Sequence, residues 1–362
     1  MPFTADVIAD INASALKNYL KKGDVLSQNI QSKPMLAAFN RRSGRFSGGN
    51  GLVVSRAVDA GQGGGSLQGY TGDDQVGYYN PTGTKRAEYT GKEHHIGMVV
   101  TMTELKQDGI EVTETGASQS TSNVSGREEH ALVDILETKY RRLNEDYDRS
   151  LDLLLHGDGS SDPLALAGIR SLILDNPGSG TTGGISRTLF PWWQNRAATA
   201  AYGGAGGQGA ITVNPSGGGS LIAFLDTEIR QLKRYNTGRT SWMWFAGSDW
   251  IDGYKSELRA NGYYAQNMAT DNSVPDGSMN DPRHAGNQIG YDPTLDDLGY
   301  EKRCYVLAMG EDDLQLKYFN GTKKQQHNPA RPYDRYVMYN GMTTTAVLTA
   351  FRLRTSAVYD IA

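Results

Sequence analysis

The chain has 362 residues, enough for two modest domains, and 21% of them are charged with a formal net charge of −4 at pH 7. This balance argues against a dedicated nucleic-acid-binding protein, which carries a clear excess of basic residues. Glycine is frequent, at 44 residues, which predicts long loops that need additional contacts to stay ordered, and contacts with other chains are one source of these. No stretch is apolar enough to cross a membrane, and the first residues do not read as a signal peptide, so we expect no membrane association.

Residues 1–45 are predicted to form a basic arm. Thr4 can cap a short amphipathic helix over 4–22, whose apolar side chains recur at helical spacing. Lys and Arg outnumber Asp in this arm, which fits either a solvated surface or contact with an acidic partner.

The next segment, 46–103, combines β-like runs with many glycines. We expect one strand over 52–58 and another over 95–102. The long stretch between them is predicted to be a two-stranded excursion, because residues 74–80 and 85–91 alternate in polarity. Since an isolated hairpin is only marginally stable in water, this one needs something to lie against.

The stretch SGREEHALVDILETKYRRLNEDYDRSLDLLLHG, residues 125–157, predicts one long helix. Ser125 and Glu128 form a capping box at its start, and Gly157 ends it. Apolar side chains recur every three or four residues and define a single packing face. These residues are Leu132, Leu136, Tyr140, Leu143, Tyr147, Leu151 and Leu154. Charged residues occupy the other side, so we expect the helix to pack on one side only.

Beyond this helix, residues 158–220 have loop chemistry around a small apolar piece at 164–173. From residue 220 the pattern changes to alternating helices and strands. Helices are expected over 220–236 and 248–262, strands over 240–247, 303–310 and 314–320, and two long β runs from 335 onward.

We predict no catalytic, cofactor-binding or metal-binding residues. GAGGQG at 204–209 has the glycine spacing of a dinucleotide site but lacks the strand before it and the helix after it, so we interpret it as a loop. The six histidines lack the spacing of a metal motif, and the lone Cys304 is expected to be a small buried hydrophobe. Pairs of acidic residues in loops and five tryptophans are also compatible with a polysaccharide hydrolase, which remains an alternative. The acid pairs are Asp73–Asp74, Asp296–Asp297 and Asp312–Asp313.

The order of these parts carries more information than any motif. A basic arm, a glycine-rich hairpin, one long helix, an α/β block and terminal strands together resemble the major capsid proteins of tailed bacteriophages, which have the Hong Kong 97-type fold. GIRSLI at 168–173, GGISRTLFPWWQN at 183–195 and the helix–strand–helix of 218–259 are similar to stretches of those proteins.

The resemblance implies an α+β fold in five segments. These are an N-terminal arm at 1–45, an extended β-hairpin or E-loop at 46–100, a P-domain at 101–160 with a spine helix at 126–156, an A-domain at 161–334, and terminal strands at 335–362 that return to the P-domain. It also implies that six hairpin residues contact a neighbouring subunit. These are Tyr70, Tyr78, Tyr79, Lys85, Arg86 and Tyr89. We interpret Lys85 and Lys92 as solubilising residues rather than as sites of covalent cross-links.

The function implied is structural, with no enzymatic activity and no cofactor. Copies of the chain would assemble as hexamers and pentamers into the icosahedral capsid shell that encloses double-stranded phage DNA, touching the DNA non-specifically. Assembly is expected in the host bacterial cytoplasm. The expected partners are a portal, a separate scaffolding protein and possibly a decoration protein. The scaffolding protein is expected to be separate because residues 1–45 are too short to contain a scaffolding segment. The final location is the virion. A tail-tube or adhesin module is the alternative, but a tube protein needs no such long helix.

Overall fold

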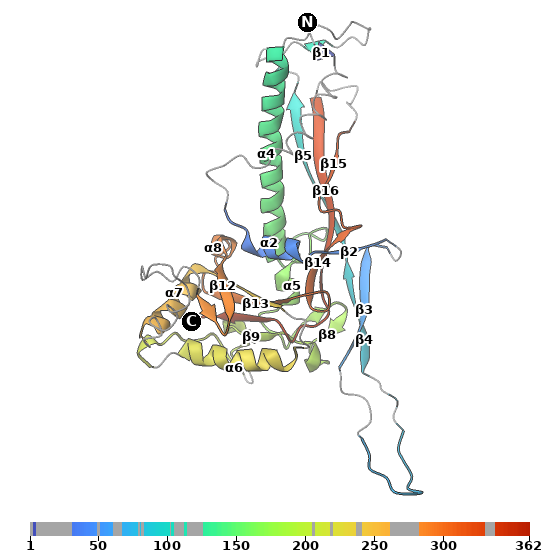
Figure 1. Cartoon of the computed structure of the whole chain (residues 1–362), viewed down its shortest axis with the longest axis vertical. Helices are drawn as coiled ribbons and strands as arrows, with labels where there is room; N and C mark the ends of the chain where they lie inside the picture. Colours follow the sequence, from blue (N-terminus) through green and yellow to red (C-terminus); the bar gives the residue numbers. More distant parts are fainter. Residues whose placement is uncertain are drawn as a thin grey trace. The chain divides into compact units, whose positions relative to one another are not determined.

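The computed structural model divides the chain into two compact units, whose elements are labelled in Figure 1. Unit 1 comprises Met1–Gln31, Glu93–Leu151 and Thr322–Thr344. Unit 2 comprises Ser32–Lys92, Asp152–Gly321 and Thr345–Ala362. The structure describes residues 3–4, 31–48, 51–60, 67–78, 80, 83–101, 103–104, 112–113, 126–204, 207–217, 220–236, 241–260, 282–329 and 337–362, with the side chains of 126–135 left out. The helix expected over 4–22 lies outside these residues except for Thr4, which belongs to β1 (Phe3–Thr4).

The long helix, α4 (Gly126–His156), is continuous over 31 residues (Figure 1). Its apolar face is buried at every predicted position from the second to the sixth. These are Leu136, Tyr140, Leu143, Tyr147 and Leu151. Leu132 lies in the helix, but its side chain is outside the described part. The last predicted position differs, because Leu155 is fully buried while Leu154 is only half-buried. Leu154 and Leu155 lie three and four residues after Leu151, and either spacing fits a helix face; the fold buries Leu155.

In unit 1, α4 packs beside three neighbouring strands of the large sheet, β5 (Lys92–Thr101), β16 (Val337–Ala350) and β15 (Gln325–His327). β15 runs antiparallel to β16, with His327 opposite Gly341. Tyr147 of the helix lies beside the Thr344 side chain of β16 and donates to the Lys323 carbonyl at 2.9 Å. α4 therefore covers the sheet face that carries Thr344.

Unit 2 is built around β13 (Arg303–Met309), in which every residue is buried. β13 pairs with β10 (Ser241–Ala246) on one side and with β17 (Ala357–Asp360) along the other edge. A strand buried along its whole length, and apolar after its first residue Arg303, is typical of the centre of a sheet covered on both faces. Cys304 is among its buried residues, as predicted.

Two amphipathic helices pack on this sheet in one apolar cluster. They are α6 (Ser220–Arg234) and α7 (Ser248–Ala260), close to the bounds predicted from the sequence. Trp244 and Trp250 lie fully inside the cluster, so these tryptophans form core instead of a sugar-binding surface.

The remaining elements are short. Those of the first half are α2 (Pro34–Arg41), β2 (Gly44–Phe46), β3 (Val53–Asp59), β4 (Thr84–Thr90), β6 (Val112–Thr113), α5 (Ile169–Leu172), β7 (Thr181–Thr182), β8 (Ile185–Ser186), the 3-10 turn Pro191–Trp193 and β9 (Arg196–Ala198). Those of the second half are the 3-10 turns Ala200–Tyr202 and Pro215–Gly217, β11 (Arg283–His284), β12 (Asn287–Tyr291), α8 (Pro293–Asp297) and β14 (Leu314–Phe319).

Three sequence expectations differ from the structure. Most of residues 34–45, expected in the N-terminal arm, form α2 and β2, and Met35 and Phe39 of α2 are buried in unit 2. The strand over 85–91 pairs with β3 rather than with 74–80, which contains no strand among its described residues. β17, expected to return to the P-domain, pairs in unit 2 with β13 and β9. Polarity patterns mark strands but do not specify their partners.

Within unit 2, a buried histidine joins the end of α4 to the start of α8. The Nδ1 of His156 lies 2.8 Å from the Asp152 carbonyl oxygen, and its Nε2 lies 3.0 Å from Oδ2 of Asp292. Both neighbours are acceptors, so both ring nitrogens carry protons and the imidazole is cationic. Asp292 also caps α8 by accepting from the Thr294 amide at 3.1 Å. Thr294 in turn donates to Asp152 at 2.6 Å.

The charge of His156 makes stability depend on pH. Burial alone would lower the pKa of His156, but the hydrogen bond and charge of Asp292, together with Asp152, raise it above the usual 6.5. This stabilisation is fully present below that value and is lost as pH rises through the raised pKa. We therefore expect the thermal unfolding midpoint of the wild-type chain to fall as pH rises from about 6 to about 9. In His156→Gln, which cannot titrate, this component of the fall disappears, and an identical pH profile in the two chains would contradict the account.

Candidate functional site

The feature that stands out in unit 2 is the hairpin, defined here as β3, β4 and the segment that connects them. The strands are antiparallel, with Val53 opposite Thr90 and Asp59 opposite Thr84. Figure 1 shows the described part of their connection, residues 67–78, beyond the end of the paired strands. The paired base of the hairpin is anchored by a buried side chain, whereas the described part of the connection exposes large apolar side chains.

At the base, Tyr89 is the main anchor. Its hydroxyl donates to the Ala350 carbonyl at 2.6 Å, and its ring meets Phe351 edge-on with centroids 5.8 Å apart. Only 8% of Tyr89 is exposed, and this burial raises the pKa of its hydroxyl well above the usual 10. The neutral phenol is therefore locked against the end of β16.

A tight turn between β7 and β8 receives this tyrosine. The Glu88 amide donates to the Gly183 carbonyl at 3.0 Å. A side chain at Gly183 would place its Cβ 3.0 Å from the Tyr89 ring, and the φ of +59° also favours glycine. The glycine is therefore required by both the backbone and the neighbouring ring.

The turn is held by a buried arginine that the sequence analysis did not single out. Arg187 has no exposed surface, and its guanidinium donates to Thr182 Oγ1 at 2.9 Å, to Asn195 Oδ1 at 2.6 Å and to the Leu172 carbonyl. All three acceptors are neutral, so burial lowers the pKa of Arg187 to about 10. A basic residue in a loop gives no sequence signal of such burial.

Charged residues at the edge of the hairpin add weaker contacts. Arg56 forms an ion pair with Asp312 at 2.7 Å, with both side chains more than a third exposed. Lys85 lies over the Phe190 ring at 5.1 Å. Exposed ion pairs stabilise little, so the buried Tyr89 matters more to the anchor.

The described part of the connection, residues 67–78, is called the tip. It exposes three large side chains: Leu67 is fully exposed, Tyr70 is 69% exposed and Tyr78 is 93% exposed. Local hydrogen bonds shape it, including the Thr71 amide to Asp74 at 3.0 Å and the Gly77 amide to Gln68 at 3.1 Å. Grouped exposed apolar side chains of this kind mark a surface that meets another molecule.

The six hairpin residues predicted as contacts thus divide into different groups. Tyr70, Tyr78, Lys85 and Arg86 are exposed, whereas Tyr79 lies outside the described residues. The prediction that Tyr89 contacts a neighbouring subunit is wrong. Side chains alternate between the two faces of β4, and the Tyr89 side chain is buried against its own chain.

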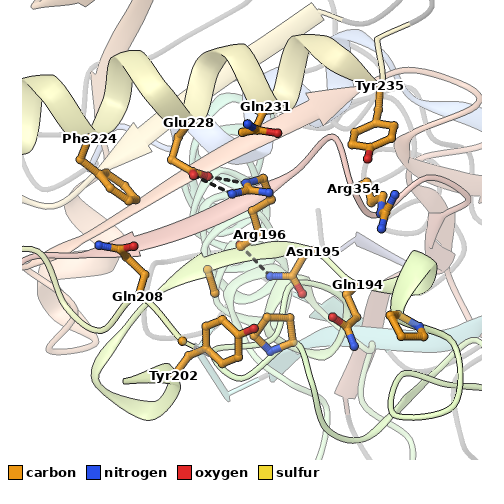
Figure 2. Close-up of a pocket in the computed structure, with 14 residues that line it drawn as sticks. Gln194, Asn195, Arg196, Tyr202, Gln208, Phe224, Glu228, Gln231, Tyr235 and Arg354 are labelled. Atoms are coloured by element: carbon orange, nitrogen blue, oxygen red, sulfur yellow. Dashed lines mark hydrogen bonds and ion pairs between the residues drawn. The ribbon is translucent and has the colours of Figure 1, made fainter. Parts of the chain in front are cut away.

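A separate cavity of about 310 Å³ lies between α6 and the loops that precede it, also in unit 2 (Figure 2). Two arginines line this cavity: Arg354 lies over the Tyr235 ring. Arg196 forms an ion pair with Glu228, because its Nη2 lies 2.6 Å from Glu228 Oε1 and its Nε contacts the other carboxylate oxygen. Tyr359 also donates to Glu228, at 3.0 Å. The GAGGQG loop contributes Gly207 and Gln208 to the rim, and no helix follows it directly in the described chain, as expected for a loop.

The loop acids have local structural contacts. Asp296 accepts from the Ser248 amide at 3.0 Å at the start of α7, Asp312 pairs with Arg56, and Asp313 accepts from Thr355 at 3.1 Å. Within the described ranges, no group of three or more His, Cys, Asp and Glu residues gathers around a common point. None of the described helices is long and apolar enough to cross a membrane.

Comparison with known proteins identifies the fold. Neither a family model nor a curated protein matches the sequence. Among solved structures, the chain is similar to the capsid asymmetric unit of cyanophage A-1(L), with a TM-score of 0.63 and 16% identity over 94% of this chain and 96% of that one. It is also similar to the capsid of cyanophage P-SCSP1u (TM-score 0.54, 10% identity, 94% and 91% covered) and of Myoviridae phage XM1 (0.52, 11%, 94% and 100%). The predicted Hong Kong 97-like capsid fold, mixed helix and sheet, is confirmed.

The anchor can be tested by removing one hydroxyl. Tyr89→Phe leaves the Ala350 carbonyl without its buried donor, so we expect a loss of about 1–3 kcal/mol in the free energy of unfolding. Tyr70→Phe makes the same chemical change at an exposed position and should stay within about 0.5 kcal/mol of wild type. Denaturant unfolding followed by circular dichroism measures both. Equal effects of the two substitutions would show that Tyr89 is not an anchor.

Proposed function

We propose that this chain is the structural subunit of an icosahedral phage capsid shell that encloses double-stranded DNA. The observation that carries the proposal is the hairpin, which is anchored at its base and exposes Leu67, Tyr70 and Tyr78 at its tip. A two-stranded hairpin is marginal in water, so such a tip needs cover from another surface. In an assembly with closed symmetry, a neighbouring copy of the same chain can provide that surface.

The fold supports this proposal independently. The similar solved structures are phage capsids, and they match over nearly the whole chain. The role we propose is structural rather than enzymatic, and the proposed location is the virion. Arrangement as hexamers and pentamers, assembly in the host cytoplasm, a separate scaffolding protein, a portal, a decoration protein and non-specific contact with DNA are parts of the same proposal. No observation favours a tail-tube, adhesin or hydrolase function over it.

The expected segments remain proposals in a revised form. We assign the hairpin to the E-loop and α4 to the spine helix of the P-domain. The segment that can act as a free N-terminal arm ends before α2, because α2 packs in unit 2.

Assembly should depend on the tip. We expect the wild-type chain, expressed with the other shell proteins of its virus, to form closed particles visible by electron microscopy. Replacing Leu67, Tyr70 and Tyr78 together by serine should leave circular dichroism unchanged and reduce particle yield at least about ten-fold, because the substituted side chains are exposed in the free chain and would lose apolar burial in the shell.

The matched control replaces Leu164 and Leu189 by serine, since both are exposed large hydrophobics outside the hairpin. This control should assemble like wild type. Particles formed equally well by the triple variant, or a wild-type chain that stays monomeric under these conditions, would overturn the proposal.

A further inference from the structure

The open face of the unit 1 sheet carries two histidines from strands on either side of β16. His95 lies in β5, His327 lies in β15, and their ring centroids are 5.2 Å apart at an angle of 40° (Figure 1 shows the three strands). His327 pairs directly with Gly341 of β16. Thr344, which contacts α4, is an odd number of residues from Gly341 and therefore points to the opposite face. The two histidines thus lie on the face away from the helix.

A glycine makes this meeting possible. A Cβ at Gly341 would lie 2.7 Å from the Nε2 atom of His95 and 3.0 Å from the Nε2 atom of His327, too close for either ring to remain in place. Gly97, two residues after His95, would likewise place a Cβ 2.9 Å from the His95 ring. Glycine inside a strand weakens it and often marks a place where another group approaches closely. Here the absence of side chains at Gly97 and Gly341 lets the two imidazole rings pack directly on the backbone.

The Nε2 atoms of both rings lie over the same residue, Gly341. Both Nε2 atoms lie within 3.0 Å of the position that a Gly341 Cβ would occupy. Zinc binds imidazole nitrogen at about 2.0–2.1 Å, so an ion held above Gly341, on the open side of the sheet, contacts both atoms when the two rings rotate toward it. His95 is exposed and His327 is half-buried, so the point between them is open to solvent.

We infer that His95 and His327 form a two-histidine site for a borderline divalent transition-metal ion such as Zn²⁺. Neutral imidazole suits Zn²⁺, Cu²⁺ and Ni²⁺, whereas Mg²⁺ and Ca²⁺ prefer oxygen ligands. Water completes the coordination on the solvent side. The inference concerns unit 1 alone and does not depend on the proposed function.

The test is calorimetric titration of Zn²⁺ into the full chain, produced without a histidine tag. We expect wild type to bind, and His95→Ala and His327→Ala each to weaken binding by more than about ten-fold, since even residues that only support a metal ligand contribute about 10–100-fold. Gln325→Ala, an exposed change two residues from His327, is the matched control and should bind like wild type. Circular dichroism verifies that each variant is folded.

Gly341→Ala provides a second test that keeps both imidazoles. The added Cβ displaces both rings from their places over Gly341, so Zn²⁺ affinity should again fall more than about ten-fold. If this variant does not fold, the two histidine substitutions decide the matter. The inference is overturned if wild type does not bind Zn²⁺, or if either histidine variant binds it with unchanged affinity, in which case the rings only pack on each other.

Discussion

A two-stranded hairpin is at best marginally stable in water, and the exposed tip of this chain has to be understood from that constraint. The chain secures the base of its hairpin by burying Tyr89 against β16 and the turn at Gly183. Among the residues that the structure describes, none covers the tip in a comparable way, and the Leu67 and Tyr78 side chains are almost entirely exposed. The division between an anchored base and an exposed tip is what a subunit needs if it is to fold alone and then join others.

Buried charges set the geometry of unit 2 at two places. Arg187 fixes the turn that receives Tyr89 by donating to Thr182, Asn195 and a carbonyl. His156 joins the end of α4 to the cap of α8 through Asp292. Removing one partner of a buried charge is costly, because the other charge or dipole is left without compensation. We therefore expect Arg187 and His156 to favour a single conformation of the segments that they contact.

The sequence predicted those features whose physical cause is local. Helix α4 followed from its apolar spacing, and the buried face matched from Leu136 to Leu151. α6, α7 and β13 followed from the same kind of pattern. Pairing is not local, so the sequence analysis joined 85–91 to the wrong strand and did not foresee that β17 pairs with β13. At the candidate site, the exposed Tyr70 and the buried Tyr89 were indistinguishable in the sequence, because only the partner surface decides which tyrosine turns inward.

The central claim, that the tip is uncovered in the free chain and covered in the shell, is tested most directly by hydrogen exchange. We expect amides of residues 67–78 to exchange rapidly in the isolated chain, while amides of β4 near Tyr89 are protected. In assembled particles the tip amides should become protected as well. Protection of the tip in the isolated chain, or rapid exchange there in the intact particle, would contradict the account.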